Sequence, residues 1–84
     1  MKKASEKVAG NVRHEELRAI VAGAPSGLGA QTLRIYLSYS KADLAKLLEL
    51  RRANVESWEM NEMPVPEYAW QKLGRMITEA LRDA

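Results

Sequence analysis

The strongest structural signal in this chain is a helical repeat of apolar residues near its C-terminal end. Apolar side chains recur there at steps of three and four: Trp70, Leu73, Ile77 and Leu81, flanked by Ala69, Met76 and Ala80. Pro66 followed by Glu67 is typical of a helix start, and the opposite face is polar. We therefore predict a helix over about residues 66–82 that packs its apolar stripe against other helices. Since no segment alternates like a strand, the fold class expected is all-α.

Shorter helices are predicted upstream of this one. They run from His14 to Ala22, from Leu28 to about Tyr39, from Lys41 to Leu48 and from Arg52 to about Met60. Gly23 is a plausible stop for the first helix, and Ser40 with Asp43 forms a capping pair at the start of the third. Asn61 tolerates the left-handed conformation found just past a helix end. These elements add up to a small bundle of four to five helices.

Length and composition limit what such a bundle can do. The chain has 84 residues and a mass of 9.4 kDa, with no cysteine and one histidine. These values exclude disulfides, cysteine-bound zinc and thiol catalysis, and they leave little for other metals. Residues 1–13 are polar and aperiodic, and we expect a mobile basic arm there containing Lys2, Lys3, Lys7 and Arg13, before one domain over residues 14–84. With neither a membrane-spanning run nor a signal peptide, the expected compartment is the cytoplasm.

Two short patterns mimic enzyme motifs. Residues 20–28 (IVAGAPSGL) resemble the glycine-rich nucleotide turn of short-chain dehydrogenases, and Tyr68 with Lys72 resembles their catalytic pair. That fold needs several β-α-β units and far more chain than separates the two patterns here. No Gly-Lys-Ser/Thr sequence of a P-loop follows Gly23. We therefore predict that the chain is not an enzyme and has no catalytic residue, cofactor or metal site.

The segment over residues 41–60 has the spacing of two short helices joined by a tight turn. Such helices cross steeply only if a small side chain, here Ala45, lies where their backbones approach. Apolar residues that hold the crossing are Leu44, Leu48, Leu50, Val55 and Trp58. The spacing leaves one face of the second helix outside, bearing Arg51, Arg52, Ala53, Asn54, Glu56 and Ser57. A helix fits the major groove, where Arg binds guanine, Asn or Ser reaches base edges or phosphates, and Glu accepts from cytosine.

The stretch from Leu33 to Leu73 resembles the Cro/repressor-type helix-turn-helix of phage repressors and bacterial transcriptional regulators, the xenobiotic-response-element group. The matching residues are Ser40-Lys41, Leu44-Ala45, Leu47-Leu48-Glu49-Leu50, Val55, Trp58-Glu59, Asn61 and Pro66. The resemblance implies a lambda-repressor-like domain in which Glu59 is structural and the residues near bases or phosphates are Lys41, Arg52, Ala53 and Ser57. Two residues depart from the pattern: Lys41 replaces a frequent glutamine, and Glu49 replaces the turn glycine, at a cost of about 1 kcal/mol if the turn is left-handed.

The expected function is sequence-specific binding of double-stranded DNA by a transcriptional regulator, most plausibly a repressor. The predicted recognition residues are Arg52, Ala53, Asn54, Glu56 and Ser57. The residues predicted to position the protein on the DNA backbone are Lys41 and Arg51, with Lys46 a further candidate. Because the net charge is only +2, positive charge must be focused on one face. We expect a homodimer on a pseudo-palindromic operator, joined through the final helix or the segment over residues 14–28.

Two other functions fit the same residues. The chain can be an antitoxin-type interaction module whose N-terminal segment binds a toxin while the helix-turn-helix represses its own promoter. It can also be a helical adaptor that never binds DNA, in which case binding to duplexes should be weak and indifferent to sequence.

Overall fold

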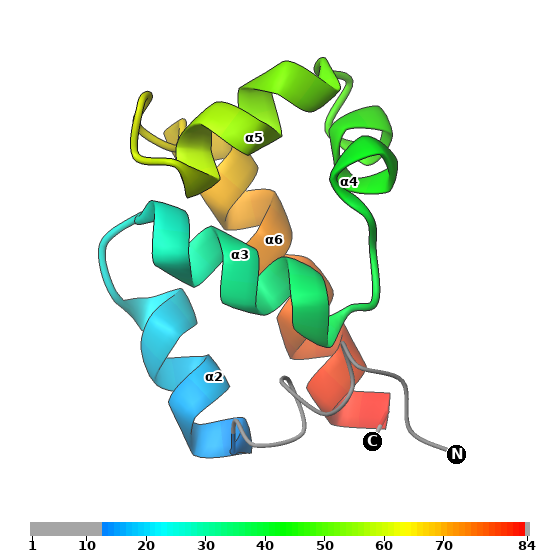
Figure 1. Ribbon diagram of the computed structural model, residues 1–84. Helices are drawn as coiled ribbons and strands as arrows, with labels where there is room; N and C mark the ends of the chain where they lie inside the picture. The colour runs from blue at the N-terminus through cyan, green and yellow to red at the C-terminus, as the bar shows by residue number, and fades with distance from the viewer. Residues whose placement is uncertain (1–12, 84) are drawn as a thin grey trace.

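The computed structural model describes residues 13–83, which form five helices without a strand (Figure 1). The helices are α2 (His14–Ala22), α3 (Gly27–Tyr36), α4 (Lys41–Leu47), α5 (Arg52–Glu59) and α6 (Glu67–Asp83). The expected all-α bundle of four to five helices is thus confirmed. Within this described range, no helix has both the length and the apolar character needed to cross a bilayer.

Most helix boundaries follow from local signals that the sequence carries. At the start of α4, the backbone N–H of Asp43 donates to Ser40 Oγ at 3.0 Å, and the N–H of Ser40 donates to Asp43 Oδ2 at 3.4 Å. After α5, Asn61 takes the left-handed conformation with φ of 61°. These two ends are formed as predicted.

The end of α3 corrects the sequence prediction. The helix was expected to run to about Tyr39, but it stops at Tyr36 because Ser38 adopts a left-handed φ of 64°. The N–H of Tyr39 then donates to the carbonyl oxygen of Arg34 at 3.2 Å, which closes the helix end. Serine is not a usual residue at such a position, so no local pattern indicated this helix end.

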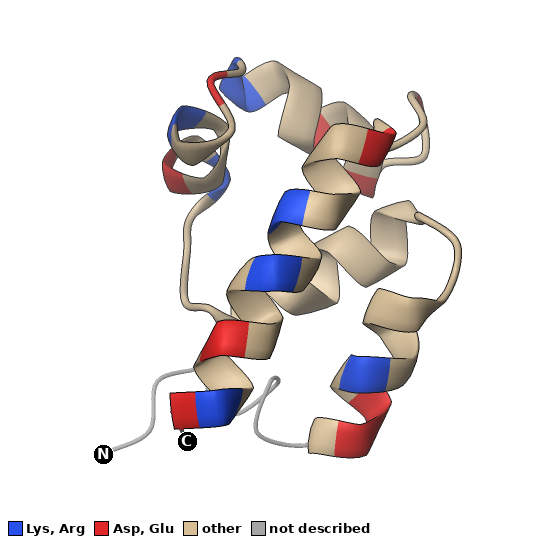
Figure 2. Cartoon of the chain, turned by 180° about the vertical axis from the view of Figure 1, so that it is seen from behind, with Lys and Arg blue, Asp and Glu red and all other residues tan. Residues whose placement is uncertain are grey.

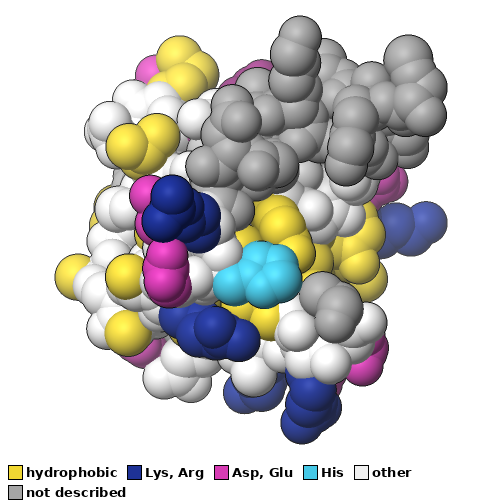
Figure 3. Space-filling model, turned by 90° about the horizontal axis from the view of Figure 1, so that it is seen from below, with side chains coloured by type: hydrophobic (Ala, Val, Ile, Leu, Met, Phe, Trp, Pro, Cys, Tyr) yellow, Lys and Arg dark blue, Asp and Glu magenta, His cyan; other side chains and the backbone are white. Residues whose placement is uncertain are grey.

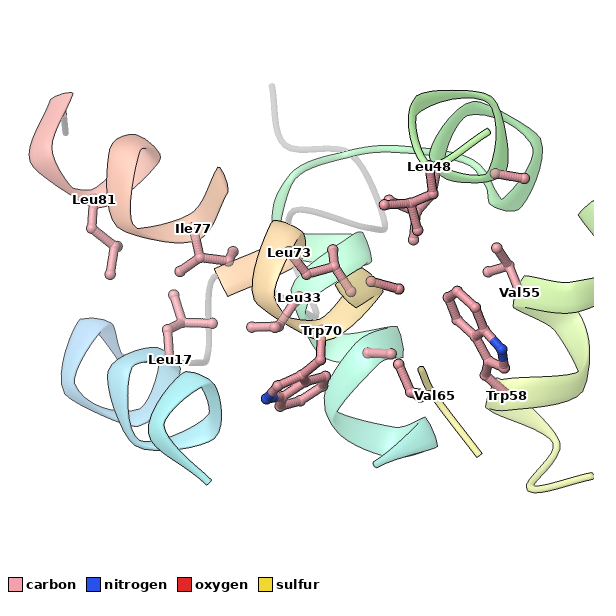
Figure 4. Close-up of a cluster of buried hydrophobic side chains, with 14 residues drawn as sticks. Leu17, Leu33, Leu48, Val55, Trp58, Val65, Trp70, Leu73, Ile77 and Leu81 are labelled. Carbon is pink, nitrogen blue, oxygen red and sulfur yellow. The ribbon is translucent and has the colours of Figure 1, made fainter. Parts of the chain in front are cut away.

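The apolar core runs as one row of side chains through the bundle (Figure 4). Leu17, Ile77 and Leu81 lie at one end of this row, and Val55 and Trp58 lie at the other. Helix α6 packs against α2 and α3, while α5 packs against α3 and α4. The predicted apolar stripe of the last helix is therefore buried, and the pair of α4 and α5 is held at one end of the bundle.

Glycines permit the close approach of α3 to its neighbours. A Cβ atom on Gly27 would collide with the carbonyl oxygen of Trp58, and a Cβ on Gly29 would lie 2.8 Å from the ring of Trp70. The indole N–H of Trp70 donates to the carbonyl oxygen of Gly23 at 3.2 Å. The glycine-rich segment that resembles a nucleotide turn thus packs closely against two tryptophan residues.

The opposite end of the molecule, where α2 begins and α6 ends, has a mixed surface (Figure 3). Hydrophobic, basic and acidic side chains are interspersed there, and the single histidine is exposed at the start of α2. The N–H of Arg13 donates to Glu16 Oε1 at 2.7 Å ahead of that helix. The remainder of the predicted basic arm, including Lys2, Lys3 and Lys7, lies outside the described residues.

Candidate nucleic-acid interface

The turn between α4 and α5 fixes how these two short helices cross. The methyl side chain of Ala45 in α4 is buried, and its carbonyl oxygen accepts from the N–H of Leu50 at 2.8 Å. Glu49 takes the left-handed conformation with φ of 59°. In Figure 1, α4 is seen nearly end-on while α5 is seen from the side. The turn is therefore left-handed at Glu49, with a carboxylate at a position that favours glycine.

The inner face of α5 is anchored by packing and by an ion pair that is largely shielded from solvent. Val55 and Trp58 are buried in the core. Glu59 Oε2 accepts from Arg34 Nε at 2.7 Å, and Glu59 Oε1 accepts from Arg34 Nη2 at 3.1 Å and from Gln31 Nε2 at 3.3 Å. The side chains of Arg34 and Glu59 are 12% and 3% exposed. Glu59 is therefore structural, as the sequence predicted, because it ties the end of α5 to α3.

Arg34 was not singled out from the sequence. Besides its bonds to Glu59, its Nη1 donates to the carbonyl oxygen of Tyr39 at 2.9 Å, so it also holds the segment between α3 and α4. Arg34 and Glu59 lie on different helices, 25 positions apart in the chain. No local spacing predicts such a pair.

The outer face of α5 begins with exposed residues. Arg51 precedes the helix, Arg52 and Ala53 are its first two residues, and all three are exposed. Asn54, Glu56 and Ser57 are half-buried, as is Lys41 at the start of α4. The structure thus brings the seven predicted site residues to the same end of the bundle.

Asn54 is engaged in the geometry of its own helix. Its Oδ1 accepts from the backbone N–H of Arg51 at 3.2 Å, so the side chain is turned toward the start of α5. The backbone carbonyl of Ser57 accepts from the N–H groups of Glu62 at 2.8 Å and Met63 at 3.3 Å. These bonds hold both ends of α5, and Asn54 keeps its two amide N–H donors and one lone pair of Oδ1 for other partners.

One carboxylate links the two helices on the outer side. Glu56 Oε2 lies 3.5 Å from Lys41 Nζ and 3.6 Å from Arg52 Nη2. The two cations come from the first positions of α4 and α5, and the same oxygen faces both of them. Glu56, which was predicted to read a base, therefore already has partners within the chain.

Basic residues lie on α4 and at the start of α5, and others lie along α6 and on α2 (Figure 2). Lys41 and Lys46 lie on α4, Arg51 and Arg52 lie at the start of α5, and acidic residues are interspersed among them. Lys72 on α6 extends this cluster, because its Nζ donates to the carbonyl oxygen of Leu47 at the end of α4 at 2.9 Å. A cation is favourable at that helix end. The sequence did not predict this role for Lys72.

The same contact bears on the enzyme-like motif. Tyr68 is 54% exposed, and the ammonium of Lys72 is bonded to α4. Both residues lie on one helix, and the glycine-rich segment is filled by packing. Over residues 13–83, no group of three or more His, Cys, Asp or Glu side chains is placed to hold a metal ion.

A separate groove lies between α2 and α6. Apolar residues such as Val21 and Trp70 line it, and its polar lining includes Arg75, Glu79 and Arg82. It involves neither α4 nor α5, so the molecule offers two distinct surfaces.

Comparisons with protein-family models, with curated proteins and with solved structures gave no match to this chain.

Proposed function

We propose that this chain is a sequence-specific double-stranded DNA-binding transcriptional regulator in which α4 and α5 act as a helix-turn-helix. The observation that chiefly supports the proposal is the two-sided character of α5. Val55 and Trp58 are buried, whereas Arg52 and Ala53 project outward beside Lys41. A helix presented in this way can enter a major groove, which is about 12 Å wide.

Each residue of the outer face has a role suited to its chemistry. The guanidinium of Arg52 can bond to O6 and N7 of guanine, and the methyl of Ala53 can contact the methyl group of thymine. Ser57 can reach a base edge or a phosphate. Lys41, Arg51 and Lys46 carry cations that suit backbone phosphates, which position a protein on the duplex without reading its sequence.

We expect the chain to act as a homodimer. One helix as short as α5 contacts only a few base pairs, so useful specificity requires two copies on two half-sites about 34 Å apart. Such a dimer would repress transcription by covering a promoter. The chain itself performs no catalysis in this proposal.

Selection of bound duplexes from a random pool, at about 150 mM salt, tests the proposal. Regulators of this kind should enrich a palindromic sequence whose half-sites are centred about 10 base pairs apart. Enrichment of no sequence, with weak binding at every salt concentration, would instead favour an adaptor that does not bind DNA.

The groove between α2 and α6 favours a second candidate, an antitoxin-type module that binds a toxin. The groove combines apolar side chains with Arg75 and Arg82, and it leaves α4 and α5 free to bind a promoter. This candidate predicts that the product of an adjacent gene changes the NMR signals of α2 and α6 on mixing. Unchanged signals would remove this candidate without affecting the first.

A further inference from the structure

We propose that Glu56 is a built-in counter-ion that sets the specificity of this surface by competing with DNA for Lys41 and Arg52. The inference rests on the proposed DNA-binding function. It assigns to one carboxylate a role beyond the base contact expected from the sequence.

The geometry makes Glu56 a shared partner of two cations. Its Oε2 lies 3.5 Å from Lys41 Nζ and 3.6 Å from Arg52 Nη2. Lys41 opens α4 and Arg52 opens α5, so the carboxylate spans the two elements that would meet the duplex. In the free protein it neutralises part of the charge that would otherwise attract any phosphate.

The two ion pairs of Glu56 are weak enough for DNA to replace the carboxylate. Both distances exceed the 2.7–2.9 Å or so of a charge-assisted hydrogen bond. The side chains are also open to water, with exposed fractions of 32% for Lys41, 38% for Glu56 and 63% for Arg52. Exposed pairs of this kind contribute little to stability, so a phosphate can replace the carboxylate at small cost.

Helix α5 does not depend on Glu56 for its position. The neighbouring carboxylate of Glu59 already fixes the helix through two hydrogen bonds from Arg34. Within residues 13–83, the ion pairs of Glu56 are those with Lys41 and Arg52. We therefore assign to its carboxylate an electrostatic role.

Glu56 makes the free energy of DNA binding less favourable. Once a phosphate binds Lys41 and a base edge binds Arg52, the carboxylate of Glu56 is left close to the negative charge of the DNA backbone, which is unfavourable on any sequence. Only a duplex that offers a donor, such as the N4 amino group of cytosine, can compensate by bonding to the carboxylate. Glu56 thus lowers affinity for most sequences and spares the correct one.

The test compares Glu56→Gln with Glu62→Gln, which removes the same charge from an exposed position beyond the end of α5. Affinities for the selected operator and for random duplex are measured over a range of salt. We expect Glu56→Gln to bind random duplex about three- to tenfold more tightly and to steepen the salt dependence by about one unit. The ratio of operator to random affinity should fall accordingly, whereas Glu62→Gln should keep the wild-type ratio.

A double variant identifies the cation that is released. Adding Lys41→Gln to Glu56→Gln should cancel most of the increase in affinity for random duplex, because the Lys41 ammonium that Glu56→Gln releases is then absent. All variants should melt within a few degrees of the wild type, since the residues changed are exposed or half-buried.

The outcomes separate the two proposals. If the wild type prefers its operator but Glu56→Gln behaves like Glu62→Gln, the role of Glu56 is overturned and the DNA-binding function stands. If the wild type shows no sequence preference, the function is overturned and the role of Glu56 falls with it. If the ratio of operator to random affinity falls for Glu56→Gln but not for the control variant, both proposals are supported.

Discussion

The two faces of α5 treat the same residue type in opposite ways. Glu59, on the inner side, accepts hydrogen bonds from two side chains of α3 and is 3% exposed. Glu56, three positions earlier on the same helix, meets its cations at 3.5 and 3.6 Å and is 38% exposed. Burial and hydrogen-bond geometry, not residue type, therefore determine whether a charged side chain stabilises the fold or remains available to a partner.

The contrast divides the expected effects of mutation. Changes on the inner face should lower stability, and changes on the outer face should alter binding while leaving stability intact. Measuring both stability and DNA binding for each variant tests this division.

Trp58→Ala should have the largest effect. The side chain is 1% exposed and among the largest in the core. Its removal should lower the free energy of unfolding by about 3–5 kcal/mol. Urea denaturation followed by circular dichroism measures this loss. Met60→Ala, at a position that is 61% exposed, should change stability by less than about 0.5 kcal/mol. Equal losses for the two variants would mean that α5 is not held by its inner face.

Glu59→Ala should come next, with a loss of about 3 kcal/mol, because it leaves the guanidinium of Arg34 buried without its main partner. The same denaturation experiment applies, with Glu62→Ala, an exposed carboxylate beyond the helix, as the matched control. A loss no larger than that of the control would show that the ion pair does not anchor α5.

Arg52→Ala should show the reverse pattern. Because its side chain is 63% exposed, stability should stay within about 0.5 kcal/mol of the wild type. Operator affinity should fall by about 1–3 kcal/mol, with preference relaxed at one base pair. Lys41→Ala should instead weaken all duplexes alike and reduce the salt slope by about one unit. An equal loss for Arg52→Ala on operator and random duplex would contradict a base contact.

Glu49→Gly should have the smallest effect and the opposite sign. The residue has φ of 59°, where an L side chain is strained and glycine is not. We expect a gain in stability of up to about 1 kcal/mol, measured by thermal denaturation. A loss would indicate that the carboxylate of Glu49 makes a stabilising contribution in the turn.

Local signals allowed much of the fold to be predicted. The apolar period of α6, the capping pair of Ser40 and Asp43, and the left-handed residue Asn61 depend on neighbours within a few positions. They gave the helix count and most of the ends. The stop of α3 at Tyr36 escaped, because it depends on a left-handed serine and on a turn that closes onto Arg34.

Contacts between distant residues could not be predicted in the same way. The pairing of Arg34 with Glu59 and the bond from Lys72 to Leu47 each join residues 25 positions apart. The sequence placed Lys41, Arg52 and Glu56 on one face but did not reveal that they contact one another. Such contacts depend on how α4 crosses α5, which only the packed structure specifies.

Titration of the labelled protein with its selected operator, followed by the NMR signals of its backbone amides, tests the assigned surface most directly. The largest changes should fall on Lys41 and on residues 51–57, with small changes along α2 and the last turns of α6. Changes concentrated instead in the groove between α2 and α6, with α5 unaffected, would contradict the assignment of α5 as the helix that reads DNA.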